Sequence, residues 1–232
     1  MKPTRIATMN ITAYKNILAS LPEGVKLIAV SKTKPASDIE LLYNEGQRAF
    51  GENKALEMRD KHDFLPKDIE WHFIGHLQTN KVKYIAPFVT MIHSIDSAEL
   101  LQTVNKLAEK NNRVIPCLLQ FHIAEETTKF GLTWDECTEL LTTPEFSELQ
   151  NIEIHGVMGM ATFTNDEAQI HSEFHKLHSY FIKLKDLYFS DKDYFKEISM
   201  GMTDDYPIAI EEHSTMIRIG SAIFGARNYN KQ

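Results

Sequence analysis

The sequence predicts a single (β/α)8 TIM barrel, a closed parallel sheet of eight strands surrounded by helices. Short apolar runs rich in β-branched residues alternate eight times with segments of helical periodicity. Such alternation is typical of parallel sheets covered by helices, and eight units within 232 residues favour a closed barrel over an open sheet. No linker or low-complexity segment divides the sequence, so we expect one domain over residues 1–232.

The predicted strands follow an extra helix at the N-terminus. They cover, in order, residues 26–31, 48–51, 71–75 and 89–93, a stretch within 114–121, a strand ending near 157–158, then 196–200 and 216–219.

Local signals indicate where several of the helices between these strands begin and end. Gly46 suits the left-handed position that often follows a helix. Asp96 with Glu99, and Thr133 with Glu136, have the spacing of a capping box at a helix start.

Composition and charge exclude several classes of protein. The formal net charge is -7 and no run of Lys or Arg occurs, which argues against nucleic acid as a partner. The N-terminal residues lack the pattern of a secretory signal, and no apolar stretch approaches the roughly 18 residues of a membrane span. We therefore expect a cytoplasmic protein with no membrane partner, and a monomer because no large apolar helix face stands out.

Lys32 is the first candidate functional residue. It continues the apolar run of the first predicted strand, at the end of the barrel where ligands of this fold bind. Removal from water disfavours the charged amine, and a neutral amine can attack an aldehyde or a ketone. The alternative is a lysine that caps the strand in solvent.

Glycine and hydroxyl residues follow the last two predicted strands. Ser199 and Gly201 lie after the seventh, and Gly220 and Ser221 after the eighth. Glycine lets the backbone approach a ligand, and a short helix opening after Gly220 would add N–H donors for an anion. Barrels commonly bind phosphate in these loops, so the segments indicate a phosphate site, with two ordinary glycine turns as the alternative.

Arg218 lies two residues before Gly220, so on a strand both project toward the barrel interior. A buried guanidinium needs a partner. The partner could be a barrel carboxylate or a ring nitrogen of a cofactor. Such a nitrogen would have to stay an unprotonated acceptor, because guanidinium only donates.

Six segments of the sequence, in this order, resemble the YggS/PROSC family of pyridoxal 5'-phosphate (PLP) homeostasis proteins over nearly the whole length. They are AVSKTKP around Lys32, FGEN ending at Asn53, WHFIGHLQTNK with His76, KFGL from Lys129, SMGMTDD from Ser199 and RIGSAIFGAR from Arg218 to Arg227. The resemblance implies an alanine-racemase-like barrel without a second domain.

The resemblance also implies roles for single residues, with PLP as the cofactor, held covalently on Lys32 as a Schiff base. Ser199, Gly201, Gly220 and Ser221 resemble the phosphate cradle, Arg218 resembles the arginine that faces the pyridine nitrogen, and Asn53, His76 and Met158 resemble pocket walls. The chain departs from the family at Gly159, where relatives often carry Thr or Ser, and at His122, where many carry Asn. Gly159 bears on the shape of the nearby pocket wall, and His122 bears on which molecules can enter beside the cofactor.

By resemblance, the protein is a non-catalytic PLP carrier for vitamin B6 homeostasis, with PLP-dependent apo-enzymes as candidate recipients. The alternative is a PLP-dependent amino-acid racemase or lyase. An arginine at the ring nitrogen opposes its protonation and weakens the electron sink of PLP. Related racemases take a catalytic tyrosine from a second domain, which the eleven residues after Ser221 leave no room for. Tyr206 precedes Pro207 and reads as a helix entry.

Two further interpretations are less favoured. A Schiff-base aldolase acting on sugar phosphates usually takes its lysine from a later strand than the first. His171, His175 and His178 share one helical face, a spacing that can bind zinc, but the glutamate of the metalloprotease pattern is missing from its position between the first two. We expect these histidines to form a solvated helix flank, with no metal site.

Overall fold

The structure is a computed structural model that describes residues 9–126 and 130–225. Lys129 and Arg227, which belong to two of the family-like segments, lie outside the described residues.

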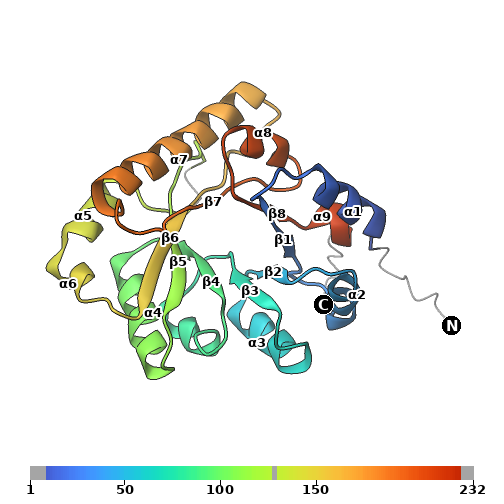
Figure 1. Ribbon diagram of the computed structural model, residues 1–232, viewed down its shortest axis with the longest axis horizontal. Coiled ribbons are helices and arrows are strands. Elements are labelled where there is room, and N and C mark those ends of the chain that lie inside the picture. The colour runs from blue at the N-terminus through green and yellow to red at the C-terminus, as the bar shows by residue number, and fades with distance from the viewer. Residues whose placement is uncertain (1–8, 127–129, 226–232) are drawn as a thin grey trace.

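Eight parallel strands form a closed barrel in sequence order, and the last strand pairs with the first (Figure 1). The strands are β1 (Lys26–Val30), β2 (Ala49–Glu52), β3 (Glu70–Phe73), β4 (Met91–Ile95), β5 (Ile115–Gln120), β6 (Ile152–Met158), β7 (Glu197–Ser199) and β8 (Met216–Ile219). Each overlaps the strand predicted for it, so the predicted (β/α)8 barrel is confirmed.

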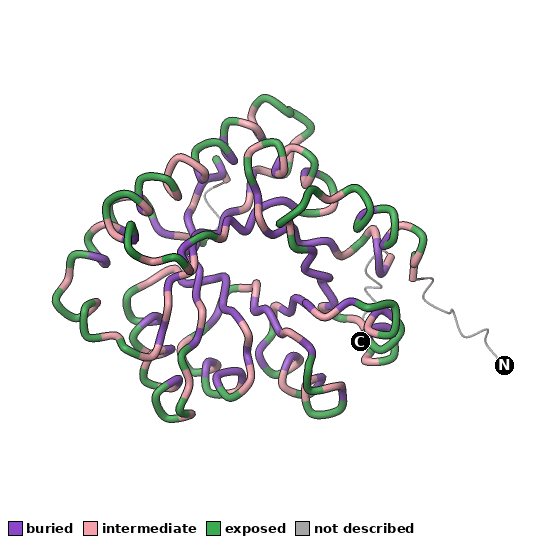
Figure 2. The backbone as a smooth tube through the Cα atoms, viewed as in Figure 1, coloured by how far each residue is buried: buried purple, intermediate pink, exposed green. Residues whose placement is uncertain are grey.

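Helices cover the outside of this barrel. They are α1 (Ile11–Ser20), α2 (Ala36–Asn44), α3 (Ala55–Phe64), the 3-10 helix η1 (Thr79–Tyr84), α4 (Ala98–Lys110), α5 (Trp134–Thr142), α6 (Pro144–Ser147), α7 (Glu167–Tyr188), α8 (Tyr206–Glu211) and α9 (Ser221–Phe224). The buried strands occupy the centre of the molecule and the exposed residues lie on the outer faces of the helices (Figure 2). The predicted N-terminal helix is α1, while η1 replaces an α-helix between β3 and β4.

Two of the predicted helix signals are confirmed. Gly46 follows α2 with a φ of 104°, in the left-handed region that favours glycine. Thr133 and Glu136 form a complete capping box at the start of α5.

The capping box predicted at Asp96 and Glu99 is wrong. Ser97 is the N-cap of α4, and its hydroxyl accepts from the Leu100 N–H at 3.3 Å. The helix starts one residue later than expected, and the Asp96 carboxylate instead contacts His76, in the segment that follows β3.

The sheet interior and its outer face carry separate apolar clusters. The interior cluster contains Ile28, Ala49, Met91, Leu118, Met158 and Met216. The larger cluster lies between the strands and the helices. The register of β5 against β6 shifts by one residue near Gly156, whose φ is 152°. A Cβ there would lie 1.8 Å from the Glu197 carbonyl oxygen, so the approach of β7 requires glycine.

In the part of the chain that the structure describes, no helix has the length and apolar character needed to cross a membrane.

Candidate functional site

A cavity of about 380 Å³ lies at the carboxyl ends of the strands. Six of the nine predicted site residues line it: Lys32, Asn53, His76, Arg218, Gly220 and Ser221. They come from β1, β2, β3 and β8 or the segments that follow these strands, so the closed sheet brings together residues from both ends of the sequence.

Lys32 lies in the turn directly after β1 and lines the cavity with its side chain partly buried. The next residue, Thr33, has a φ of 64°, which is uncommon for a residue with a branched side chain. Lys34 also lines the cavity, and its Nζ donates to the carbonyl oxygens of Phe224 at 2.7 Å and Gly225 at 3.2 Å. The turn after β1 is therefore tied to the end of α9.

Gly220 and Ser221 adjoin this turn because β8 pairs with β1. A Cβ at Gly220 would lie 3.2 Å from the Val30 carbonyl oxygen, so glycine permits the close approach of the two strand ends. Ser221 begins α9, and its hydroxyl lies 3.1 Å from that of Thr203, in the segment after β7. Thr203 also lines the cavity, so the segments after β7 and β8 together present hydroxyl and backbone donors.

The other three predicted site residues lie outside the set that lines the cavity. Met158 is fully buried in the interior apolar cluster, and Met160, two residues later, lines the cavity in its place. Gly201 has a φ of 93°, and a Cβ there would lie 2.6 Å from the Cβ of Ala209. Its carbonyl accepts from the Arg218 N–H at 2.9 Å, so Gly201 shapes the backbone behind the site.

Ser199, the last residue of β7, is fully buried with its side chain inside the barrel. Its Oγ lies 2.7 Å from Arg218 Nη1 and 2.9 Å from His93 Nδ1. His93 Nε2 in turn lies 2.9 Å from His72 Nδ1. Arg218, Ser199, His93 and His72 thus form what we call the interior polar row, which begins at the cavity. The Ser199 hydroxyl therefore contacts Arg218 and His93 inside the barrel, whereas a residue that binds phosphate would be expected to line the cavity.

The arginine fixes the direction of one hydrogen bond in the interior polar row. Because guanidinium only donates, Ser199 Oγ accepts from Arg218, and its second lone pair and its hydrogen allow it either to accept from His93 Nδ1 or to donate to it. Burial lowers the pKa of both His93 and His72, so both rings are neutral at pH 7. If Ser199 donates, both ring protons are on Nε2; if Ser199 accepts, both are on Nδ1.

The far end of the row lies beside a surface ion pair. His72 Nε2 lies 3.9 Å from a carboxylate oxygen of Glu70, the same oxygen that Lys26 Nζ contacts at 2.9 Å. This distance is too long for a hydrogen bond, and His72 Nε2 has no hydrogen-bond partner among the described residues. Glu70 and Lys26 are the first residues of β3 and β1, so the row spans the barrel from its mouth to its opposite end.

Arg218 is 4% exposed, and both of its side-chain hydrogen bonds go to neutral oxygens. Nη1 donates to Ser199, and Nη2 donates to the Gly159 carbonyl at 3.0 Å. Burial lowers the pKa of Arg218 to about 10, opposed by the charge of Asp205, so the guanidinium stays charged at pH 7. This positive charge at the cavity favours an acceptor or an anion as ligand.

Asn53 and His76 form part of the cavity wall. Asn53 packs on Gly75, where a Cβ would lie 2.5 Å from the Cβ of Asn53. His76 Nδ1 lies 3.0 Å from Asp96 Oδ2, and its ring stacks on Phe130 with centroids 4.0 Å apart. Phe130 and Met160 also line the cavity and were missed, although Phe130 lies within a family-like segment and Met160 follows a strand end.

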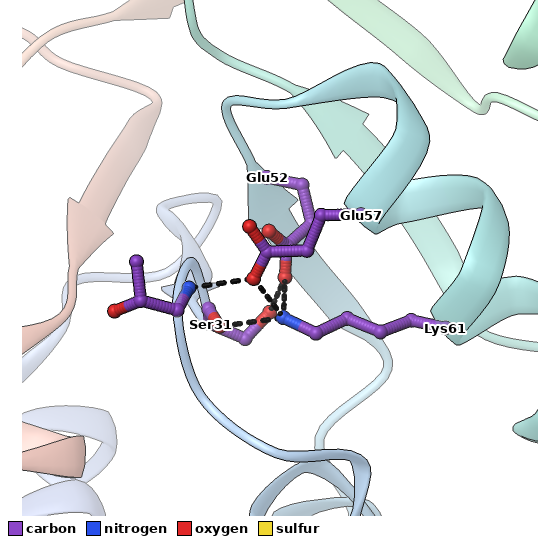
Figure 3. A network of polar contacts seen from close by, with 5 residues as sticks. Ser31, Glu52, Glu57 and Lys61 are labelled. Carbon is purple, nitrogen blue, oxygen red and sulfur yellow. Dashed lines mark hydrogen bonds and ion pairs between the residues drawn. The ribbon is translucent and has the colours of Figure 1, made fainter. Parts of the chain in front are cut away.

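A second buried group of charges lies beside the turn that carries Lys32 (Figure 3). Lys61 of α3 is 8% exposed, and its Nζ donates to Glu52 Oε1 at 2.6 Å, Glu57 Oε1 at 2.8 Å and the Ser31 carbonyl at 2.8 Å. Ser31 Oγ donates to the same Glu52 oxygen at 2.6 Å. We call Ser31, Glu52, Glu57 and Lys61 the Lys61 network. No feature of the sequence analysis had indicated it.

Comparisons with known proteins agree with this geometry. The profile of the alanine racemase N-terminal domain family matches residues 8–228. The pyridoxal phosphate homeostasis protein of Pasteurella multocida is 38% identical over 217 residues, covering 92% of this chain and 91% of that protein. The Escherichia coli protein of the same description is 35% identical over 215 residues, covering 91% and 89%.

The chain belongs to the pyridoxal phosphate homeostasis protein family.

Solved structures place the family in the same fold. PipY of Synechococcus elongatus, solved without and with PLP, is 32% identical and superposes with TM-scores of 0.86 and 0.84, covering 92% of this chain and 99% of that one. An alanine racemase of Clostridium difficile gives a TM-score of 0.72 at 15% identity, covering 95% of this chain but 57% of the racemase. The racemase likeness shows a shared barrel fold.

The structure shows the surroundings of Gly159 and His122, the two positions at which the chain is expected to depart from the family pattern. A Cβ at Gly159 would lie 2.8 Å from Ile123 Cδ1 and 2.9 Å from Leu177 Cδ2, so these side chains fill the space that a larger residue would need. His122 Nε2 lies 2.8 Å from the Glu126 carbonyl oxygen, within the loop that follows β5.

The three histidines of α7 are partly or largely exposed, as expected for a solvated flank, and they also contact the end of α8. His171 and His175 bond Glu212 through Nδ1 at 2.9 and 3.1 Å, and the ring centroids of His178 and His213 lie 4.5 Å apart. They join α7 to the end of α8. Among the described residues, no group of three or more His, Cys, Asp or Glu side chains is arranged to hold a metal ion.

We expect Ser199→Ala to lower the free energy of unfolding by about 2 kcal/mol, because it removes an acceptor from Arg218 and the hydrogen-bond partner of His93 Nδ1 at a fully buried position. Ser94→Ala is the matched control. Ser94 is equally buried, but its Oγ has no hydrogen-bond partner among the described residues. Its substitution should change stability by less than about 0.5 kcal/mol or raise it. Urea denaturation measures both, and equal effects would contradict the interior polar row.

The Lys61 network should make stability depend on pH. Burial raises the pKa of Glu52 from 4.5 to about 6, against the opposing effects of Lys61 and Ser31. The folded state therefore binds more protons than the unfolded state between these values, and its stability falls as pH rises toward and through 6. From about pH 5 to pH 7, the wild type should lose about 1 kcal/mol relative to Glu52→Gln, which cannot titrate. If the wild type instead gained stability relative to Glu52→Gln between pH 5 and pH 7, the pKa of Glu52 would be lowered by folding and the prediction would be wrong.

Proposed function

We propose that the chain holds PLP in this cavity as a Schiff base on Lys32 and takes part in PLP homeostasis without turning over a substrate. The observation that carries the proposal is that one cavity presents a primary amine, a buried guanidinium and a set of hydroxyl and backbone donors. The PLP-bound structure of PipY supports it. Delivery to apo-enzymes, a cytoplasmic location and a monomeric state remain predictions.

The residues present fit the chemistry of PLP. Asn53 Oδ1 is a buried acceptor without a hydrogen-bond partner among the described residues, so it suits a ligand donor. The Arg218 guanidinium suits the pyridine nitrogen, and the cavity of about 380 Å³ suits a small ligand. When bound, PLP supplies an aldehyde, and the Lys32 amine forms a C=N bond with its carbon and releases one water molecule.

The remaining predicted residues take supporting roles in this proposal. Gly220 and Ser221, with Thr203, would hold the phosphate, since they supply donors where β7 and β8 end. Ser199 and Gly201 would act by fixing Arg218, because each accepts a hydrogen bond from it. Met158 would support the cavity floor from the interior apolar cluster.

The absence of turnover rests on Arg218. A donor-only partner keeps the ring nitrogen unprotonated, which weakens PLP as an electron sink. Tyr206 begins α8 and lies outside the residues that line the cavity, which argues against it as a substitute for the racemase tyrosine. One observation favours the alternative of a racemase or lyase: His76, paired with Asp96, is a second acid/base group at the cavity.

Lys32→Ala should abolish covalent attachment of PLP while weak binding persists through the phosphate donors. The absorbance band of the Schiff base and the mass of the chain after borohydride reduction measure attachment. Lys34→Ala is the control and should keep the covalent attachment. Lys34 lines the same cavity, but its Nζ donates to the Phe224 and Gly225 carbonyls. Attachment that survives in Lys32→Ala, or none in the wild type, would refute the proposal.

A second measurement separates carrier from enzyme. The PLP-loaded wild type should racemise and decarboxylate common amino acids no faster than free PLP at the same concentration. Turnover well above free PLP that His76→Gln abolishes would instead support the racemase or lyase alternative.

A further inference from the structure

The turn that carries Lys32 is held on both sides of that residue. Before it, the Ser31 N–H donates to the Gly51 carbonyl at 3.0 Å, and the Ser31 carbonyl accepts from Lys61 at 2.8 Å. After it, the Thr33 N–H donates to Glu57 Oε1 at 2.6 Å. The backbone on either side of Lys32 is thus bound to side chains of one helix, α3.

The backbone conformation of this turn needs such support. Thr33 has a φ of 64°, and the left-handed region is unfavourable for a β-branched residue. Conformations of this kind persist where surrounding contacts over-determine them. The contact from Glu57 to the Thr33 N–H is a direct restraint of that kind.

Lys61 unites these restraints. Its ammonium has three hydrogens, and three acceptors surround it: two carboxylates and the Ser31 carbonyl (Figure 3). Glu57 is placed by Lys61 four residues later on α3, and the same Glu57 oxygen meets Thr33. Removing the ammonium would leave Glu52 and Glu57 side by side, with the Ser31 carbonyl unbonded on that side.

We propose that Lys61, with Glu57, is a positioning residue that fixes the turn at residues 31–34 so that the Lys32 amine meets its carbonyl ligand in the cavity. The hydrogen bonds of the Lys61 network connect β2 and α3 to Ser31 and Thr33, the two residues on either side of Lys32. This inference rests on the proposed function and concerns how fast the bond to Lys32 forms, not how PLP is held otherwise.

The test compares covalent attachment with non-covalent binding. Attachment is followed as the rate at which the Schiff-base band appears after PLP is added, with borohydride fixation on Lys32 as the end point. Non-covalent affinity is measured with 4'-deoxypyridoxine 5'-phosphate, which has the ring and the phosphate but no aldehyde. All measurements are made well below the melting temperature of the least stable variant.

Two substitutions of Glu57 form the matched pair. Glu57→Gln keeps an oxygen that can accept from the Thr33 N–H, whereas Glu57→Ala removes it. We expect Glu57→Ala and Lys61→Met to slow attachment roughly tenfold or more, since small displacements of a reacting group have effects of this size. Glu57→Gln should stay within about threefold of the wild type, and the affinity for the analogue should change less than about twofold in all three.

Arg113→Met controls for a general loss of stability. Arg113 is partly buried and donates to the Ala86 and Val89 carbonyls at 2.6 and 2.7 Å, away from the cavity. It should melt at a lower temperature and attach PLP at the wild-type rate.

Each other result has a definite meaning. If the wild type attaches PLP and Glu57→Ala attaches it as fast, the positioning role is wrong while the proposed function stands. If attachment and analogue affinity fall in parallel, and Arg113→Met behaves alike, the Lys61 network serves only the fold and the inference is overturned. If the wild type itself is never fixed on Lys32, the proposed function fails. Should Lys61→Met not fold, the Glu57 pair decides.

Discussion

Parallel hydrogen bonding between β1 and β8 joins the first and last strands, and the cavity depends on this closure. Residues 26–29 pair with residues 216–219, so both strands end at the same place. Beyond the paired residues, the Val30 carbonyl lies so close to Gly220 that a Cβ there would be 3.2 Å away. A side chain at this position would make a tight contact with the Val30 backbone, which would have to shift by a few tenths of an ångström. The amine and the donors of Ser221 share one cavity because of this approach.

Two buried cations, Lys61 and Arg218, lie near the ends of the paired strands β1 and β8. Their hydrogen-bond partners differ in charge. Lys61 lies between two carboxylates, so its charge is compensated within the protein. Arg218 bonds a hydroxyl and a carbonyl, both neutral, and faces the cavity. An uncompensated buried charge is costly, and a ligand that brings an acceptor or a negative charge to the cavity offsets that cost. One cation thus orders the scaffold and the other is available to a ligand.

Local patterns could predict the barrel and four residues of the cavity, Lys32, Arg218, Gly220 and Ser221, whereas Asn53 and His76 came from the family resemblance. Strand-like runs alternating with helical periodicity set the fold, and ligands of such barrels bind where the strands end. Lys32 and Ser221 each lie two residues after the end of their strands, β1 and β8, so their place at the mouth was predictable. The capping box at Thr133 was predictable for the same reason, since its partner lies three residues away. The error at Asp96 shows the limit of such patterns: an adjacent serine capped the helix, and the aspartate bonded His76.

Side-chain direction inside the barrel depends on contacts that no local pattern contains. Ser199 and Ser221 both lie close to a glycine after a strand, yet Ser199 is still part of β7 and meets Arg218 and His93, the latter 106 residues away in sequence. No local sequence pattern distinguishes Lys61 from the other lysines. Its burial and its contacts with Glu52 and Ser31 arise only in the folded chain. Buried ion pairs often stabilise a fold no better than apolar residues of the same size. Net stability therefore gives little reason for three charges beside the turn at residues 31–34, whereas the geometry they impose on Lys32 does.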